Sequence, residues 1–186
     1  MTISVNDFRT GITIELEGQL WTVVDFQHVK PGKGAAFVRT KLKNVEKGTT
    51  VEKTFRGGEK VQRAIVERKP YQYLYESEGD YVFMDSNTYE QVNVSADKMG
   101  DGLKWLKDSM EVQIVFHDTR ILEVEMPNFV ELAVTQTDPG LKGDTAQGGS
   151  KPATVETGAV VTVPLFVEEG DVLQIDTRSG EYLKRV

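Results

Sequence analysis

Residues 12–45, ITIELEGQLWTVVDFQHVKPGKGAAFVRTKLKNV, alternate apolar and polar side chains over short runs that are interrupted by glycine. In the first run the apolar side chains share one face of an extended chain: Ile12, Ile14 and Leu16. Period-two alternation of this kind predicts half-buried strands, and Gly18 predicts a turn after the first of them. We expect further strands over 21–29, 34–45 and 49–55, which together form a small β-barrel.

The same alternation continues to the end of the chain and predicts an all-β fold. A second group of short apolar runs lies between Tyr71 and Met126, and a third follows Pro127-Asn128, which forms a natural boundary. Three consecutive domains are therefore expected: 1–64, 65–127 and 128–186.

Two segments depart from the strand pattern. Residues 97–108 have helical spacing, and the two glycines within them predict that this helix is short. Residues 138–154 are rich in Gly, Pro and Ser, and they predict a long loop between strands at 129–134 and 159–167.

One sequence pattern occurs twice. Glu78-Gly79-Asp80 is followed by Asp85-Ser86, and Glu169-Gly170-Asp171 is followed at the same spacing by Asp176-Thr177. The pattern predicts two hairpins with the same turn chemistry rather than a duplicated module.

Charge is distributed unevenly along the 186 residues, whose formal net charge is -7. Residues 1–64 carry eleven Lys and Arg against seven Asp and Glu, whereas 65–127 carry six against thirteen and 128–186 carry five against nine. A basic first domain followed by acidic ones predicts a partner that is a polyanion at one end only.

Composition narrows the class of protein. The chain has no cysteine, so disulfides, thiolate nucleophiles and cysteine-based zinc sites are excluded. No apolar run approaches the roughly 20 residues of a membrane helix, and the first residues lack the pattern of a signal peptide. We therefore expect a cytoplasmic protein that does not bind a membrane.

Residues that could support catalysis or metal binding are few. His28 and His117 are the two histidines, and neither belongs to a His-Glu-x-x-His pattern. The Gly-x-Ser-x-Gly, Walker A and Gly-x-Gly-x-x-Gly patterns are absent. We predict a protein that is not an enzyme and that holds neither a metal nor a cofactor.

Lys33 is the most informative residue of the chain. It stands in Lys30-Pro31-Gly32-Lys33-Gly34, between two predicted strands. Pro before Gly suits the two central positions of a type II turn, which places Lys33 at a hairpin tip without neighbouring side chains to shelter it. A lysine there reaches into a partner, although a plain solubilising charge has the same pattern.

Three cations line one face of the strand that follows: Arg39, Lys41 and Lys43. Such a stripe suits the phosphates of a nucleic acid. A solvent-facing strand that carries lysine against aggregation has the same pattern.

Two other functions remain open at this point. Aromatic residues of the second domain could form the stacking platform of an OB-type barrel that binds single-stranded nucleic acid or an oligosaccharide: Tyr71, Tyr73, Tyr75, Tyr81 and Phe83. The acidity of this domain argues against a bare phosphate strand. A Schiff-base enzyme that uses Lys33 is disfavoured, because an exposed tip offers no burial to activate the amine.

Six longer motifs carry a family resemblance: FQHVKPGKG at 26–34, EKTF at 52–55, PNFVEL at 127–132, DPGLKGDTA at 138–146, GSKPAT at 149–154 and DTRSGEYL at 176–183. In this order and over essentially its full length, the chain resembles the bacterial elongation factor P family, relatives of the hypusine-bearing translation factor of archaea and eukaryotes. The branch of the family with arginine at the tip is excluded, because position 33 is lysine.

The resemblance implies a fold and a function. The fold is a KOW-like (SH3-like) β-barrel followed by two OB-fold barrels, arranged in an L that resembles tRNA. The function is that of a translation elongation factor that binds the ribosome between the P and E sites. There it stimulates peptide-bond formation and relieves stalls at consecutive prolines, by positioning the CCA end of peptidyl-tRNA.

The resemblance also assigns residues and partners. Lys33 matches the positioning lysine, which is usually lengthened by a covalent modification that separate enzymes add, and four residues shape its loop: Lys30, Pro31, Gly32 and Gly34. Gly143, Asp144 and Thr145 match the loop that approaches the E-site codon. From charge and alternation, Arg39, Lys41 and Lys43 are expected to contact the RNA backbone, as is Lys30. The expected partners are the ribosome, peptidyl-tRNA and the lysine-modifying enzymes, and the chain is expected to be a monomer.

Overall fold

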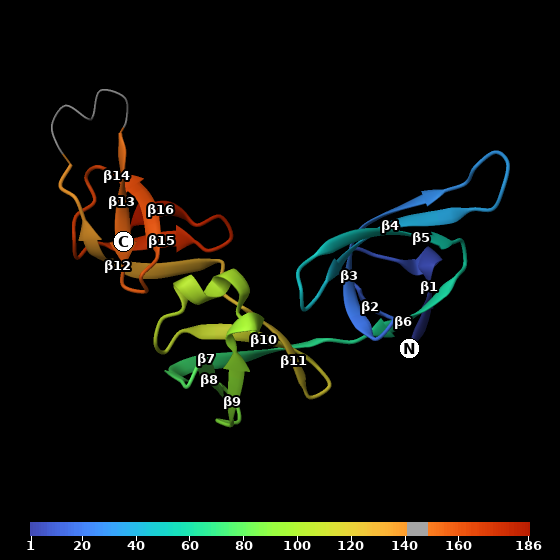
Figure 1. The fold of residues 1–186 in the computed structure, drawn as a ribbon, viewed down its shortest axis with the longest axis horizontal. Helices are drawn as coiled ribbons and strands as arrows, with labels where there is room; N and C mark the ends of the chain where they lie inside the picture. The colour runs from blue at the N-terminus through green and yellow to red at the C-terminus, as the bar shows by residue number, and fades with distance from the viewer. Residues whose placement is uncertain (141–148) are drawn as a thin grey trace. The chain divides into compact units, whose positions relative to one another are not determined.

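The computed structural model describes residues 1–140 and 149–186 of the chain. Within these residues the strands form three sheets, and the helical segments are short 3-10 helices (Figure 1). The predicted all-β class is confirmed.

The first sheet has six strands in the order β1-β6-β2-β3-β4-β5 and curls into a barrel (Figure 1). Neighbouring strands are antiparallel. Its elements are β1 (Thr2–Ser4), the 3-10 helix η1 (Val5–Asp7), β2 (Thr13–Leu16), β3 (Gln19–Val29), β4 (Phe37–Asn44), β5 (Thr50–Arg56) and β6 (Lys60–Ala64).

The core of this barrel follows from the alternation along its strands. Ile14 is fully buried and Leu16 packs against the same cluster, as the sequence pattern predicts. The other buried members come from η1, the residue after it and strands β3 to β6, and include Val5, Val23, Val38, Leu42 and Phe55. Between β2 and β3, Gly18 has φ +76, a left-handed conformation that glycine adopts without strain, so the predicted turn is confirmed.

The second sheet has five strands in the order β11-β10-β7-β8-β9. Its elements are β7 (Glu67–Ser77), β8 (Asp80–Asp85), β9 (Gln91–Ser95), η2 (Ala96–Lys98), η3 (Gly100–Trp105), β10 (Glu111–His117) and β11 (Arg120–Glu125).

The prediction of a single helix over 97–108 is wrong. The segment forms two 3-10 helices, η2 and η3, that end at Trp105. Gly100 has φ +54, which a right-handed α-helix cannot accommodate, and a Cβ at Gly102 would lie 2.5 Å from Cγ of Met126. The glycines therefore allow a tight connection against the sheet but not a regular helix.

The third sheet has five strands in the order β14-β13-β12-β15-β16. The strands are β12 (Phe129–Thr137), β13 (Ser150–Val155), β14 (Val160–Pro164), β15 (Val172–Asp176) and β16 (Glu181–Arg185). Strand β13 begins within the loop predicted over 138–154, at Ser150, so that prediction is wrong for its last part. Only Ala153 and Val155 give β13 an apolar face, and Pro152 hides the strand pattern.

The second and third sheets share one spatial order. Each has its first strand, β7 or β12, at the centre, its second and third strands on one side, and its fourth and fifth strands on the other. This is the arrangement of a five-stranded OB barrel. The repeated sequence pattern falls on β8 in one sheet and β15 in the other, which are the second and the fourth strands. It therefore reflects shared turn chemistry, as predicted, because the two copies occupy different places in the fold.

The chain divides into two compact units, Met1–Arg68 with Val115–Glu123, and Lys69–Ile114 with Val124–Val186. In the first unit, the tip of the β10–β11 hairpin packs on the barrel through a cluster of Leu20, Ala64, Val115 and Leu122. In the second unit, Trp105 of η3 belongs to the core of the third sheet. The strands of the three sheets lie within 2–64, 67–125 and 129–185. The domain boundaries proposed at 64 and 127 stay a prediction.

The turn between β8 and β9 depends on Asp85, a buried residue that is 8% exposed. Its Oδ1 accepts hydrogen bonds from the backbone N–H groups of Asn87, at 2.8 Å, and Thr88, at 3.2 Å. These bonds favour the charged carboxylate and therefore lower the pKa of Asp85. The bond from Asn87 has the largest effect.

We expect Asp85→Ala to lower the melting temperature by several degrees at neutral pH, because two backbone donors lose their acceptor. A group whose pKa is lowered by folding stabilises the native state above its unfolded pKa, and this contribution is lost as the pH falls through the folded pKa. The difference in melting temperature between wild type and Asp85→Ala should therefore shrink in acid. Asp85→Asn keeps the acceptor oxygen and serves as the control. A constant difference between wild type and Asp85→Ala from neutral pH to acid would contradict this role.

Candidate functional site

The connection between β3 and β4 carries Lys33. The two strands pair from Trp21 opposite Asn44 to Val29 opposite Phe37, so they project the connection beyond the barrel (Figure 1). Lys33 is exposed, as are both of its neighbours, and it has no hydrogen bond, ion pair or ring contact within the described residues. The predicted placement of Lys33 at the tip of a hairpin is confirmed.

The conformation of this connection differs from the one predicted. A type II turn centred on Pro31 and Gly32 needs a positive φ at Gly32, but the positive φ is found at Gly34, with +105. The prediction of a type II turn at Pro31 and Gly32 is therefore wrong. Pro31 instead lies beside Gly34, where a Cβ would come 3.9 Å from the proline Cγ, so the left-handed glycine follows the lysine.

A cavity of about 670 Å³ opens at the base of this connection. Its polar lining includes Asn6, His28, Lys30 and Arg56, which come from four different segments of the first barrel. The sequence analysis predicted a binding role for Lys30, and the fold places His28 and Arg56 beside it in the lining of this cavity. Only the antiparallel register of β3, β4 and β5 brings these side chains together.

Backbone contacts brace the base of the connection. The N–H of Gly57 donates to the carbonyl of Ala36 at 2.9 Å, and a Cβ at Gly57 would lie 3.1 Å from that oxygen. The N–H of Gly58 donates to Oδ1 of Asn6 at 3.2 Å. Gly57 thus supports the chain where it enters β4 from the loop, and Gly58 links the same segment to η1.

The three cations of β4 are exposed and separated by buried residues, so the predicted stripe is confirmed as a surface feature. Their neighbours across the sheet differ. Lys41 lies between Asp25 of β3 and Glu52 of β5 in register, whereas Arg39 and Lys43 have uncharged neighbours on both sides. The two carboxylates offset the charge of Lys41, so Arg39 and Lys43 dominate the positive face.

The Gly143, Asp144 and Thr145 segment lies outside the described residues. Lys30, Gly32 and Gly34 lie with Lys33 on the loop, and Pro31 is partly buried there.

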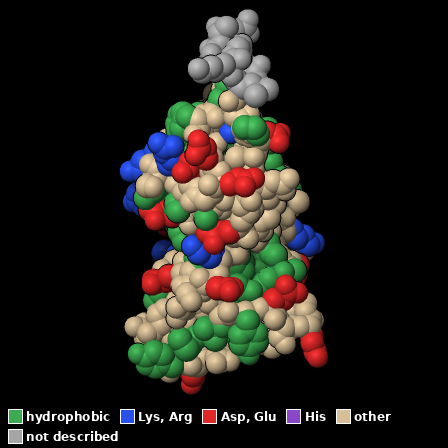
Figure 2. All heavy atoms as spheres, turned by 90° about the vertical axis from the view of Figure 1, so that its left-hand side faces the viewer, with side chains coloured by type: hydrophobic (Ala, Val, Ile, Leu, Met, Phe, Trp, Pro, Cys, Tyr) green, Lys and Arg blue, Asp and Glu red, His purple; other side chains and the backbone are tan. Residues whose placement is uncertain are grey.

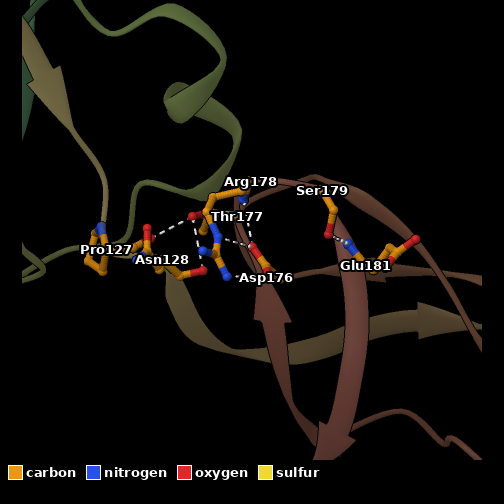
Figure 3. Close-up of polar contacts among 7 residues, drawn as sticks. All are labelled: Pro127, Asn128, Asp176, Thr177, Arg178, Ser179 and Glu181. Atoms are coloured by element: carbon orange, nitrogen blue, oxygen red, sulfur yellow. Dashed lines mark hydrogen bonds and ion pairs between the residues drawn. The ribbon is translucent and has the colours of Figure 1, made fainter. Parts of the chain in front are cut away.

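A cluster of polar contacts joins the β15–β16 turn of the third barrel to the chain that enters this barrel (Figure 3). The guanidinium of Arg178 donates to Asp176 from Nε at 3.0 Å and from Nη2 at 2.8 Å, and this pairing lowers the pKa of Asp176. Thr177 makes two hydrogen bonds to the linker that enters the barrel. Its Oγ1 donates to the carbonyl of Pro127 at 2.5 Å, and its backbone N–H donates to the carbonyl of Asn128 at 2.9 Å. These residues of the DTRSGEYL motif therefore connect the β15–β16 hairpin to the start of β12.

The aromatic platform considered for the second domain is not formed. Tyr71, Tyr73 and Phe83 are buried, and Tyr75 alone of the five aromatics is exposed, at 51%. Burial raises the pKa of Tyr73, and the ring of Tyr73 packs 5.4 Å from that of Phe83. These side chains fill the core, so they cannot stack on nucleic-acid bases.

Acidic side chains are spread over the exposed face of the second compact unit rather than gathered at one point (Figure 2). No cluster of three or more potential metal ligands occurs in the part of the chain that the structure describes. Within the same residues, no helix is long and apolar enough to cross a membrane.

Fold and site together define a class of protein: a KOW-like barrel with a projecting lysine, followed by two OB barrels. Family models of elongation factor P match in the same order, the KOW-like domain at residues 4–61, the OB domain at 66–124 and the C-terminal domain at 130–185. The chain belongs to the elongation factor P family and is a translation elongation factor, as the motifs indicated.

Similar proteins are found at high identity. The elongation factor P of Pelotomaculum thermopropionicum is 61% identical over 184 residues, which cover 99% of this chain and 100% of the relative. That of Prochlorococcus marinus strain MIT 9301 is 58% identical over 183 residues, 98% of each chain. Among solved structures, the translation initiation factor 5A from Methanococcus jannaschii matches with a TM-score of 0.55 at 24% identity, covering 67% of this chain and 93% of its own. That likeness supports the fold alone.

The stripe on β4 leads to a ranked prediction. We expect Arg39→Gln and Lys43→Gln each to weaken binding to bacterial tRNA and to reduce the slope of log affinity against log salt by about one, the effect of one lost phosphate contact. Lys41→Gln should reduce it less, because Asp25 and Glu52 flank Lys41. Fluorescence anisotropy over a range of KCl concentrations measures the slopes. Equal slopes for all three variants and wild type would contradict a phosphate-binding stripe.

Proposed function

We propose that this chain binds the ribosome between the P and E sites and stimulates peptide-bond formation, with Lys33 positioning the CCA end of peptidyl-tRNA. The observation that carries the proposal is the exposed Lys33, without a partner among the described residues, at the end of two long paired strands. An ammonium held away from the barrel on a braced hairpin is free to make its hydrogen bonds to another molecule.

The chemistry of proline explains why such positioning accelerates synthesis. The proline ring fixes φ and its nitrogen is a secondary amine, so consecutive prolines place the reacting groups poorly. Holding the peptidyl-tRNA end in a near-attack geometry supplies orientation, which is worth roughly 7–11 kcal/mol at its upper limit. Lys33 is then a positioning residue that supplies no proton to the reaction and forms no covalent bond with the reacting groups.

The remaining basic residues support this role through charge. Lys30, at the wall of the basal cavity, and Arg39, Lys41 and Lys43 on β4 would contact the RNA backbone. The Gly143, Asp144 and Thr145 segment would approach the E-site codon. The acidic second and third domains would occupy space beside RNA without binding phosphate themselves.

Covalent lengthening of Lys33 fits its exposure, because a modifying enzyme needs access to the amine and a longer arm reaches further. Lysine-modifying enzymes are therefore among the proposed partners, beside the ribosome and peptidyl-tRNA. We propose that the chain acts in the cytoplasm as a monomer and that it needs no cofactor beyond this modification.

Lys33→Ala should abolish the relief of stalling at consecutive prolines while leaving the fold intact, because the side chain is exposed and makes no hydrogen bond, ion pair or ring contact within the described residues. The measurement is the rate of synthesis through a proline stretch in a reconstituted translation system, with protein purified from its own cells. Lys60→Ala, which removes an exposed lysine from β6 of the same barrel, is the matched control and should act as wild type. Full activity of Lys33→Ala would refute the assignment.

A further inference from the structure

The cavity at the base of the β3–β4 connection has a lining rich in hydrogen-bond donors. Four polar side chains contribute to it: Asn6, His28, Lys30 and Arg56. Among the described residues that line the cavity, none is Asp or Glu. A concave site that combines an ammonium, a guanidinium and neutral donors favours an anionic ligand.

The donors of this lining are available to a ligand. Within the described residues, neither the ammonium of Lys30 nor the guanidinium of Arg56 has a hydrogen bond or an ion pair. The Oδ1 of Asn6 accepts a hydrogen bond from the N–H of Gly58 at 3.2 Å, so the amide oxygen is occupied while the amide nitrogen remains as a donor. The fold therefore orients Asn6 without using the group that a ligand would need.

The acidic side chains near the cavity leave its cations unpaired. Oε2 of Glu59 accepts a hydrogen bond from the backbone N–H of Arg56 at 3.0 Å, but Glu59 forms no ion pair with the guanidinium among the described residues. Asp7 follows Asn6 in the chain and does not line the cavity. Glu59 offsets part of the positive potential, and the donors of the guanidinium stay unused.

The rest of the lining is largely apolar. Val29, Phe37 and Arg56 lie opposite one another in register on β3, β4 and β5. This row leads from an aliphatic side chain through an aromatic ring to a guanidinium, and Ala35 and Ala36 extend its apolar part. An aromatic ring beside cations fits a nucleotide, whose phosphate binds the cations and whose base or ribose packs against the ring.

We propose that this cavity binds one unpaired nucleotide of an RNA strand, with its phosphate held by Arg56 and Lys30 and its base or ribose against Phe37. The inference rests on the proposed function for the identity of the partner, RNA, and adds a pocket to the exposed stripe of β4. The volume of about 670 Å³ lies in the usual range of small-ligand sites. A base inside a double helix cannot enter such a pocket, so the site selects a single-stranded segment.

The alternative is that these cations only attract polyanions through their summed charge. The two roles differ in their dependence on space. A pocket binds a short ligand saturably and loses affinity when its space is filled, whereas attraction by charge alone depends on the number of cations and not on their surroundings.

The experiment follows the backbone amide signals of the isotope-labelled full chain by NMR during titration with the single-stranded RNA trinucleotide ApApA. We expect saturable shifts at residues 35–37 and 56–57, and adenosine, which lacks a phosphate, should bind at least about tenfold more weakly. Arg56→Gln should weaken the binding of ApApA by about tenfold, the effect of one charge-assisted hydrogen bond. Arg63→Gln removes an exposed arginine of β6 outside the cavity and should bind as wild type.

Ala35→Leu tests the space of the cavity with every charge in place. Ala35 is exposed and lines the cavity, so a larger side chain there occupies the site without disturbing the core. We expect several-fold weaker binding of ApApA and unchanged amide signals in the second and third domains. Wild-type affinity of Ala35→Leu would show attraction by charge alone and would overturn the pocket.

Three further results would overturn the inference: no saturable shifts at the cavity in wild type, equal affinities of Arg56→Gln and Arg63→Gln, or binding of adenosine 5′-monophosphate without binding of ApApA. The last result would assign the cavity to a free nucleotide instead of an RNA strand. Because no ribosome takes part in these measurements, their failure leaves the proposed function standing. Wild type that binds ApApA but does not relieve stalling refutes the proposed function and not the pocket.

Discussion

The antiparallel pairing of β3 with β4 is the interaction on which the rest of the site depends. Its register, from Trp21 opposite Asn44 to Val29 opposite Phe37, decides which side chains face the core and which face a partner. A shift by one residue would turn Val38 and Leu42 outward and bury the cations of β4. Among the described residues, the same pairing carries Lys33 away from side chains that could neutralise it, while the contacts of Gly57 and Gly58 brace the base of the connection.

Much of this arrangement was predictable from the sequence, because strand alternation is a local property. The all-β class, the position of Lys33 and the exposed cations of β4 follow from side-chain periodicity and from the glycines around position 33. The positive φ at Gly34 rather than Gly32 did not follow, since Pro-Gly is compatible with several turns and the strand ends decide among them. The flanking of Lys41 by Asp25 and Glu52 required the register of three strands.

The missed strand β13 shows where local reasoning fails. Lys151 and Pro152 resemble loop residues, and only two apolar side chains mark the inner face of the strand. The strand forms because it is paired on both sides, with β12 and with β14. The burial of Lys151 follows from that pairing, so it could not be predicted from the sequence either. The aromatics of the second domain are the opposite case, since a plausible binding platform proves to be core.

Membership of the elongation factor P family rests on matches along nearly the whole chain, whereas the proposed role at the ribosome rests on Lys33. The most direct test times synthesis through three consecutive prolines in a reconstituted system, with and without the chain purified from its own cells, beside a proline-free message. Selective acceleration of the proline message is the predicted result. Equal rates with and without the chain, when mass spectrometry shows that Lys33 carries its modification, would contradict the account.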